Sequence, residues 1–288
     1  MVFFFLYAMG HVSGDIGAAE IVANAGMLLV IFGALFVVNF IVKRNGLTKD
    51  SAYAAFFMMF YLLFFPSVLN NPNLLLSNFF ILLALRRLIS LTSLKSTKEK
   101  VFDASLWIFL AALFHFWSIL YIVLVFISIL FHVARDYRNW MIPFIAAFAI
   151  MTIYILFALI YDENHISGFL NKIYIDYKID YFKNTNENLA LSIFASVALY
   201  FVATMVLSLS GKPQLLQPSY KKLVASFVIG VVIFIISPNK SNDLLIFTFA
   251  PLSVMATSHI ESSQSQLKQE IILALFILSA VFLFFIQL

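Results

Sequence analysis

The sequence contains no cysteine and few charged residues. Without cysteine, disulfide bonds, a thiolate nucleophile and a cysteine-ligated metal site are all excluded. Charged residues make up 11% of the chain, whereas a soluble domain has about 25%. Long hydrophilic segments are also missing, so any active site has to be built from helix ends and loops. The net charge of +4 belongs to short loops, and we expect no nucleic-acid partner because no soluble basic domain is present.

Apolar runs of about twenty residues recur along the whole chain, and this is the length that crosses the hydrocarbon core of a bilayer. The pattern predicts an all-α, polytopic transmembrane bundle that forms one integral membrane domain over residues 1–288. Membrane lipids are therefore its expected surroundings. The sequence predicts ten spanning helices, over residues 22–42, 51–69, 74–91, 103–115, 117–134, 140–161, 190–208, 222–237, 244–258 and 271–288.

The fourth and fifth of these helices share one apolar stretch, residues 101–134. It is too long for one ordinary span and short for two. We expect a turn at residues 114–118, because the His and Trp found there are tolerated at a membrane interface. A single tilted helix, or a half-helix followed by a full one, is the alternative.

The basic residues fall on alternate loops. Of the 18 lysines and arginines, twelve lie in loops 43–50, 92–102, 135–139, 209–221 and 259–270 or at their helix borders. Because cytoplasmic loops carry the excess of Lys and Arg, these loops are predicted to be cytoplasmic. The C-terminus then lies on the non-cytoplasmic side. Together with the absence of cysteine, this arrangement fits a multi-pass protein of a bacterial inner membrane.

The first nine residues form an apolar stub that is too short to span a membrane. The stub has no basic n-region and no small-residue cleavage site, which argues against a signal peptide. We expect it to be the outer half of a helix, and an interfacial anchor is the alternative.

Residues 162–189 form the largest non-cytoplasmic loop. Apolar and tyrosine residues recur there at helical spacing, which predicts an amphipathic helix on the outer leaflet. Glu163 and His165 lie where the preceding helix leaves the membrane and are candidate substrate-binding residues. The loop would then gate a lateral entrance for a lipid-linked substrate. The simpler interpretation is a structural interfacial helix with solvated charges.

Asp15 lies in the first outer loop and is the candidate catalytic residue. In membrane glycosyltransferases that use polyprenyl-phosphate sugars, an acidic residue at this place acts as a base or a metal ligand. A carboxylate there would deprotonate the acceptor hydroxyl while the bond between sugar and phosphate breaks. A helix cap in a solvated loop is the alternative.

Arg86 and Arg87 interrupt the third apolar helix, about 18–20 Å from its outer end. Charges at such a depth are costly unless they snorkel, pair or face a cavity. Because adjacent helical residues diverge by about 100°, we expect one arginine to reach cytoplasmic phosphates and the other to pair with Asp103. The planar guanidinium suits a pyrophosphate, so both are candidate substrate-binding residues.

Lys240 is the only cation in the short outer loops and is a candidate for binding a lipid diphosphate leaving group. It belongs to the polar segment 237–243. A second outer turn, at residues 70–73, could line the same vestibule. Ordinary turn chemistry is the alternative and explains both segments adequately.

The five histidines show neither the i, i+4 spacing of a helical metal site nor an HExxH motif. We therefore predict no protein metal site and find no haem or flavin motif. A divalent cation as a cofactor is left open.

Several motifs together resemble a Bacteroidota family of polytopic inner-membrane proteins with no assigned function. They lie at residues 70–74, 77–80, 83–87, 102–107 and 136–140. More loosely, the layout is similar to that of polysaccharide polymerases and polyprenyl-phosphate-dependent glycosyltransferases. This resemblance implies cell-envelope glycan assembly, in which a polyprenyl-linked sugar is bound at the outer face. The alternatives are a transporter or flippase, with Pro251 as the best candidate for a helix break, and a non-catalytic membrane scaffold.

Overall fold

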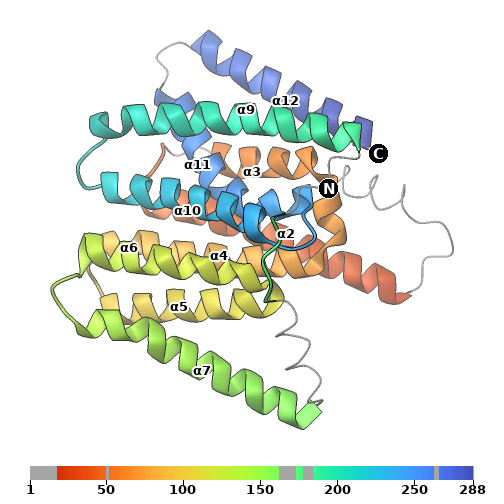
Figure 1. Cartoon of the computed structure of the whole chain (residues 1–288). Helices are drawn as coiled ribbons and strands as arrows, with labels where there is room; N and C mark the ends of the chain where they lie inside the picture. Colours follow the sequence, from red (N-terminus) through yellow and green to blue (C-terminus); the bar gives the residue numbers. More distant parts are fainter. Residues whose placement is uncertain (1–17, 50–51, 162–172, 178–183, 263–265, 288) are drawn as a thin grey trace.

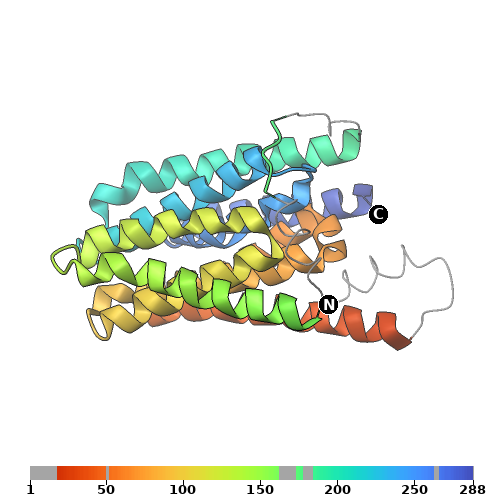
Figure 2. The same ribbon diagram turned by 60° about the horizontal axis from the view of Figure 1, so that its bottom comes forward.

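The chain folds into an all-helical bundle (Figures 1 and 2). The computed structural model describes residues 18–49, 52–161, 173–177, 184–262 and 266–287. These residues form ten α-helices and no strand, which confirms the predicted fold class. The helices are α2 (Ala18–Arg44), α3 (Tyr53–Phe64), α4 (Pro72–Ile89), α5 (Thr97–Phe114), α6 (Ile122–His132), α7 (Arg138–Tyr161), α9 (Thr185–Ser208), α10 (Gln217–Ile236), α11 (Ile246–Ser262) and α12 (Gln266–Gln287).

Each α-helix follows one of the predicted apolar runs. Seven helical segments of the described chain are long and apolar enough to cross a membrane, and two shorter apolar segments are Tyr53–Phe64 and Phe116–His132. The stretch 101–134 does turn at its aromatic centre, because His115 adopts an extended conformation after α5 and a 3-10 helix precedes α6. The 3-10 helices are η1 (Pro66–Asn70), η2 (Ser90–Ser93), η3 (Phe116–Tyr121), η4 (Leu209–Gly211) and η5 (Asn242–Leu245).

Successive helices run in opposite directions, so their connections gather at two ends of the bundle (Figure 2). At one end, Lys98 pairs with Asp136 at 3.3 Å and Lys212 donates to Ser258 at 2.7 Å. We name it the basic end, since Arg44, Arg87, Arg135 and the two lysines just named lie there. At the other, Ser67 donates to Asp243. We name it the Asp243 end, defined by residues 66–71, 115, 237–243 and 287.

Helix α11 is the centre of the fold. Its residues 246–258 are all buried, and the helix packs against α3, α4, α9 and α10. Helix α10 comes especially close, because a Cβ added at Gly230 would lie 2.8 Å from the Cγ2 atom of Thr248 and 3.1 Å from the carbonyl carbon of Phe247. Only glycine therefore allows these two helices to approach so closely.

Pro251 lies inside α11 and has no amide hydrogen to donate to the carbonyl of Phe247, four residues earlier. The buried hydroxyl of Tyr121 donates to that carbonyl at 2.9 Å and also contacts the carbonyl of Ser226 at 3.2 Å. The side chain from η3 thus replaces the missing bond of the helix. Pro251 is buried here and does not border an open break in the helix.

We expect the Tyr121→Phe substitution to lower the free energy of unfolding by about 1–3 kcal/mol, because a buried carbonyl loses its donor. In a Pro251→Ala background, the alanine amide supplies that hydrogen, and the same substitution should cost less than about 1 kcal/mol. The four variants can be compared by thermal unfolding in detergent. An equal cost in both backgrounds would show that Tyr121 does not compensate for Pro251.

The predicted amphipathic helix over residues 162–189 is wrong where the structure describes it. Residues 173–177 have no regular secondary structure, and α9 begins only at Thr185. The backbone amide of Asp176 donates to the carbonyl of Ile236 at 3.2 Å, and its carbonyl accepts from Lys240. These bonds to the α10–α11 connection take the place of helical bonds. Residues 162–172 and 178–183 lie outside the described part of the chain.

Candidate functional site

The candidate site is a polar cluster at the Asp243 end, where the α3–α4 and α10–α11 connections meet. The side chain of Asp243 is buried, and the residue is 4% exposed. Its two carboxylate oxygens accept hydrogen bonds from the hydroxyl of Ser67 and from the side-chain amide of Asn71. A single carboxylate thus joins η1 to η5 across more than 170 residues of sequence.

Further polar contacts surround this carboxylate. The Nε2 atom of His115 lies 3.2 Å from the hydroxyl of Ser237, and the amide of Asn242 donates to the carbonyl of Glu187 at 3.1 Å. The ammonium of Lys240 donates to the carbonyl of Asp176. An ammonium has three protons, so this contact orients Lys240 without using up its donors.

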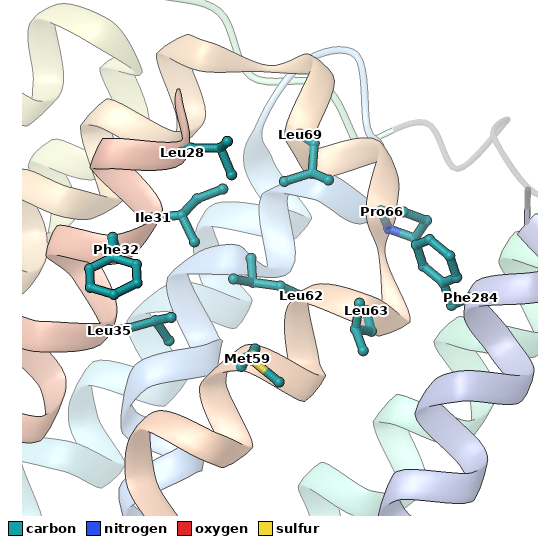
Figure 3. A pocket seen from close by; sticks show the side chains of 10 residues that line it. All are labelled: Leu28, Ile31, Phe32, Leu35, Met59, Leu62, Leu63, Pro66, Leu69 and Phe284. Carbon is teal, nitrogen blue, oxygen red and sulfur yellow. The ribbon is translucent and has the colours of Figure 1, made fainter. Parts of the chain in front are cut away.

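An apolar groove lies on the other side of η1 (Figure 3). Its volume is about 160 Å³, and it opens to the outside of the bundle past Phe32, which is 61% exposed. Pro66 and Leu69 of η1 line it, while Ser67 of the same short helix faces the carboxylate. The remaining lining residues come from three helices: Leu28, Ile31, Phe32 and Leu35 of α2, Met59, Leu62 and Leu63 of α3, and Phe284 of α12.

The structure separates the predicted substrate-binding cations. Lys240 lies in the polar cluster, whereas Arg86 and Arg87 are in the last turn of α4. Helix α4 starts beside Asp243, so its rise places Arg86 about 21 Å away, near the basic end. Asp15, Glu163 and His165 lie outside the described residues, so their proposed roles stay predictions.

Arg86 and Arg87 have different surroundings, as expected for consecutive residues of a helix. Arg87 pairs with Asp103 at 2.8 Å, as expected for one member of the pair. The guanidinium of Arg86 lies 4.7 Å from the ring centre of Phe40 on α2. A partly exposed ion pair and a cation–π contact both account for these charges without a ligand.

Lys222, counted with the basic residues at the border of the predicted loop 209–221, lies well inside a helix. Helix α10 already begins at Gln217, and Lys222 is fully buried, while Lys221 is exposed. The ammonium of Lys222 donates to the carbonyl of Leu88 at 2.6 Å, near the C-terminus of α4. A cation is favourable there because the last carbonyls of a helix are unpaired and carry partial negative charge.

Two charged groups of the basic-end loops have shifted pKa values. The pKa of Asp136 is lowered, chiefly because its carboxylate accepts a hydrogen bond from the backbone amide of Arg138, at 3.0 Å. Burial lowers the pKa of Lys212, and the charge of Glu261 opposes that shift. Both groups lie at the basic end, far from the polar cluster.

No group of three or more histidine, aspartate or glutamate side chains in the described residues could hold a metal ion. The polar cluster offers hydroxyl, amide, imidazole, ammonium and carboxylate groups. Its members are Ser67, Asn71, His115, Ser237, Lys240, Asn242 and Asp243. Such a set suits hydrogen bonding to a hydroxyl-rich head group. The sequence prediction included residues 237–243 and 70–73 as outer turns, but the burial of Asp243 and its bonds to Ser67 and Asn71 were missed.

The helices and their apolar surfaces define the class of the molecule: a polytopic, all-helical membrane protein. The family model described as "Family of unknown function (DUF6427)" matches residues 1–288, so the chain belongs to that family. This confirms the predicted membership of an uncharacterised family. No curated protein and no solved structure matches the chain.

Proposed function

We propose that the protein binds a polyprenyl-linked sugar at the Asp243 end and acts in cell-envelope glycan assembly, as a glycosyltransferase or polymerase. The observation that carries this proposal is the two-sided character of η1. Its Pro66 and Leu69 border an apolar groove that opens to lipid, while its Ser67 belongs to the polar cluster. A lipid-linked sugar has the same two parts, an apolar chain joined to a polar head.

The proposal places the basic end in the cytoplasm and the Asp243 end at the outer face of the inner membrane. The positive-inside rule supports this orientation, because the short loops of the basic end contain most of the lysines and arginines. The last described residue of α12, Gln287, donates to the carbonyl of Phe64 at the Asp243 end, so the C-terminal end of α12 would face outward.

In this proposal the first part of the polyprenyl chain lies in the groove of Figure 3. Lys240 is held in place by the carbonyl of Asp176 and would bind the lipid phosphate, stabilising the leaving group. His115, positioned by the buried hydroxyl of Ser237 at 3.2 Å, would hydrogen-bond the sugar. Asp15 remains the proposed base for the acceptor hydroxyl.

A strain that lacks the gene, complemented with wild-type or variant protein, tests the proposal. Loss of the protein should lead to accumulation of a polyprenyl-linked precursor, measured by mass spectrometry of lipid-linked and surface glycans. Wild type should restore the normal profile, whereas Asp15→Ala and Lys240→Met should not. Lys221→Met is a matched control, because this exposed lysine lies at the basic end and should behave as wild type. An unchanged glycan profile in the deletion strain rules out glycan assembly.

The second candidate function is a non-catalytic membrane scaffold, and the close packing around α11 favours it. Residues 246–258 are all buried, and the hydroxyl of Tyr121 donates to the carbonyl of Phe247, which lacks a helical partner because of Pro251. The same packing weakens the transporter alternative, which needs a broken helix beside a midplane cavity.

A further inference from the structure

A second groove lies between α9 and α12, on a different side of the bundle from the groove of Figure 3. Its volume is about 480 Å³. Figure 1 shows the two helices meeting near the first residues of α9 and separating toward the first residues of α12. The groove is lined by Ile193, Ser196, Val197, Tyr200 and Phe201 of α9 and by Ile272, Leu275, Phe276 and Ser279 of α12.

The groove, which we call the wedge, is narrow at the Asp243 end, where one hydrogen bond joins α12 to α9 and a second joins α12 to α3. The side-chain amide of Asn186 donates to the carbonyl of Ile286 at 2.9 Å, and Gln287 donates to the carbonyl of Phe64 at 2.9 Å. Toward the middle, the ring of Phe276 packs on α3, with its centre 4.9 Å from that of Phe57 and 5.1 Å from that of Tyr61. Helix α12 is therefore tied to α3 and to the start of α9, which leaves the wedge open toward the basic end.

Polar groups lie at the open side of the wedge. Tyr200 lines the groove, is 49% exposed, and its hydroxyl lies 3.0 Å from the Nε2 atom of His259. His259 in turn interacts electrostatically with Lys212, whose ammonium donates to Ser258 at 2.7 Å. Tyr200 is thus a polar member of the groove lining, and the imidazole of His259 and the ammonium of Lys212 lie next to it, beyond the lining. Glu261, which interacts with Lys212, is the nearby opposing charge.

We propose that this wedge is a binding site for one glycerophospholipid, whose phosphodiester contacts Tyr200, His259 and Lys212. Both bordering helices are long and apolar enough to cross the membrane, so the groove opens sideways into the bilayer, where lipid chains are the available occupant. The head-group residues lie at the basic end, where the lipid phosphates of that leaflet are found. Tyr and Lys are the side chains that commonly meet phosphates at the interface.

The site is separate from the Asp243 end and does not depend on the function proposed for it. Phosphate contacts come from Tyr200 of α9, from Lys212 of the α9–α10 loop and from His259 in the last turn of α11. Chain contacts come from α9 and α12. A lipid in the wedge would fill the space between α12 and α9. The bound lipid should therefore stabilise the packing of α12 on the rest of the bundle.

Native mass spectrometry of the protein in a mild detergent, titrated with phosphatidylglycerol, tests the proposal. The wild type should bind one lipid with saturation. The double substitution Lys212→Met with His259→Gln removes two groups that contact the phosphate and should weaken binding about tenfold, equivalent to about 1.4 kcal/mol. Lys221→Met also removes a lysine of the basic end, but outside the groove, and should bind as wild type.

A second variant keeps the test decisive if the double substitution impairs folding. Ser196 is exposed and lines the groove, so Ser196→Phe should obstruct part of it and weaken binding without touching the core. A photoreactive phosphatidylglycerol in nanodiscs should label α9 and α12 in the wild type. Equal lipid binding by all variants, or labelling that avoids both helices, would overturn the proposal.

Discussion

Replacing Gly230 with leucine should eliminate most of the folded protein. A Cβ atom at this position would lie 2.8 Å from the Cγ2 atom of Thr248, 3.1 Å from the carbonyl carbon of Phe247 and 3.2 Å from its oxygen. Two of these three atoms belong to the backbone of α11, which is buried on all sides and has no room to move. We expect a cost of about 3 kcal/mol or more, at the upper end of overpacking penalties.

The Gly230→Ala substitution separates two effects: crowding of the added Cβ against α11, and the low stability of glycine within a helix. Alanine is favoured over glycine within a helix by about 0.8–1 kcal/mol. Replacing a glycine by alanine should therefore stabilise the protein wherever the added Cβ has room. Gly26 on α2 is such a position, because a Cβ there would meet no atom within 4 Å. Thermal unfolding in detergent should show Gly26→Ala as stabilising and Gly230→Ala as destabilising. Two changes of the same sign would contradict the close approach of α10 and α11.

The positions of the helices could be predicted because each depends on local composition. About twenty apolar residues in sequence specify a spanning helix whatever it packs against, and the aromatic turn at residues 114–118 divided the ambiguous stretch correctly. The alternation of basic loops predicted which connections lie together. The apolar runs and the basic loops can both be recognised from short stretches of consecutive residues.

The polar cluster could not be predicted in the same way, since its bonds join distant segments. Asp243 and its partner Asn71 are 172 residues apart, and each alone is an ordinary turn residue. The segment 173–177 shows the same limit. Its residues have helical spacing, but the backbone of Asp176 bonds to the carbonyl of Ile236 and to the side-chain ammonium of Lys240 instead. The burial of Lys222 was not predicted either, because the predicted helix began at residue 222, whereas α10 begins at Gln217.

Replacing Asp243 with alanine should destabilise the protein by about 3 kcal/mol, because Ser67 and Asn71 would both lose a buried acceptor and each unsatisfied donor costs about 1–3 kcal/mol. Asp243→Asn keeps the volume and one acceptor oxygen but turns an amide group toward a donor. We expect it to cost about half as much. Thermal unfolding in detergent measures both changes.

A double-mutant cycle with Asn71→Ala separates the bond from other effects of the substitution. If the carboxylate holds η1 to η5, removing Asn71 should cost little once Asp243 is already alanine, and the coupling should exceed about 1 kcal/mol. Additive costs would contradict the link. Because η1 also borders the groove of Figure 3, loosening it should weaken binding of undecaprenyl phosphate, the probe for the proposed substrate, even in variants that remain folded. Lipid binding in the α9–α12 wedge should be unchanged in these variants, since neither Asp243 nor Asn71 lines it.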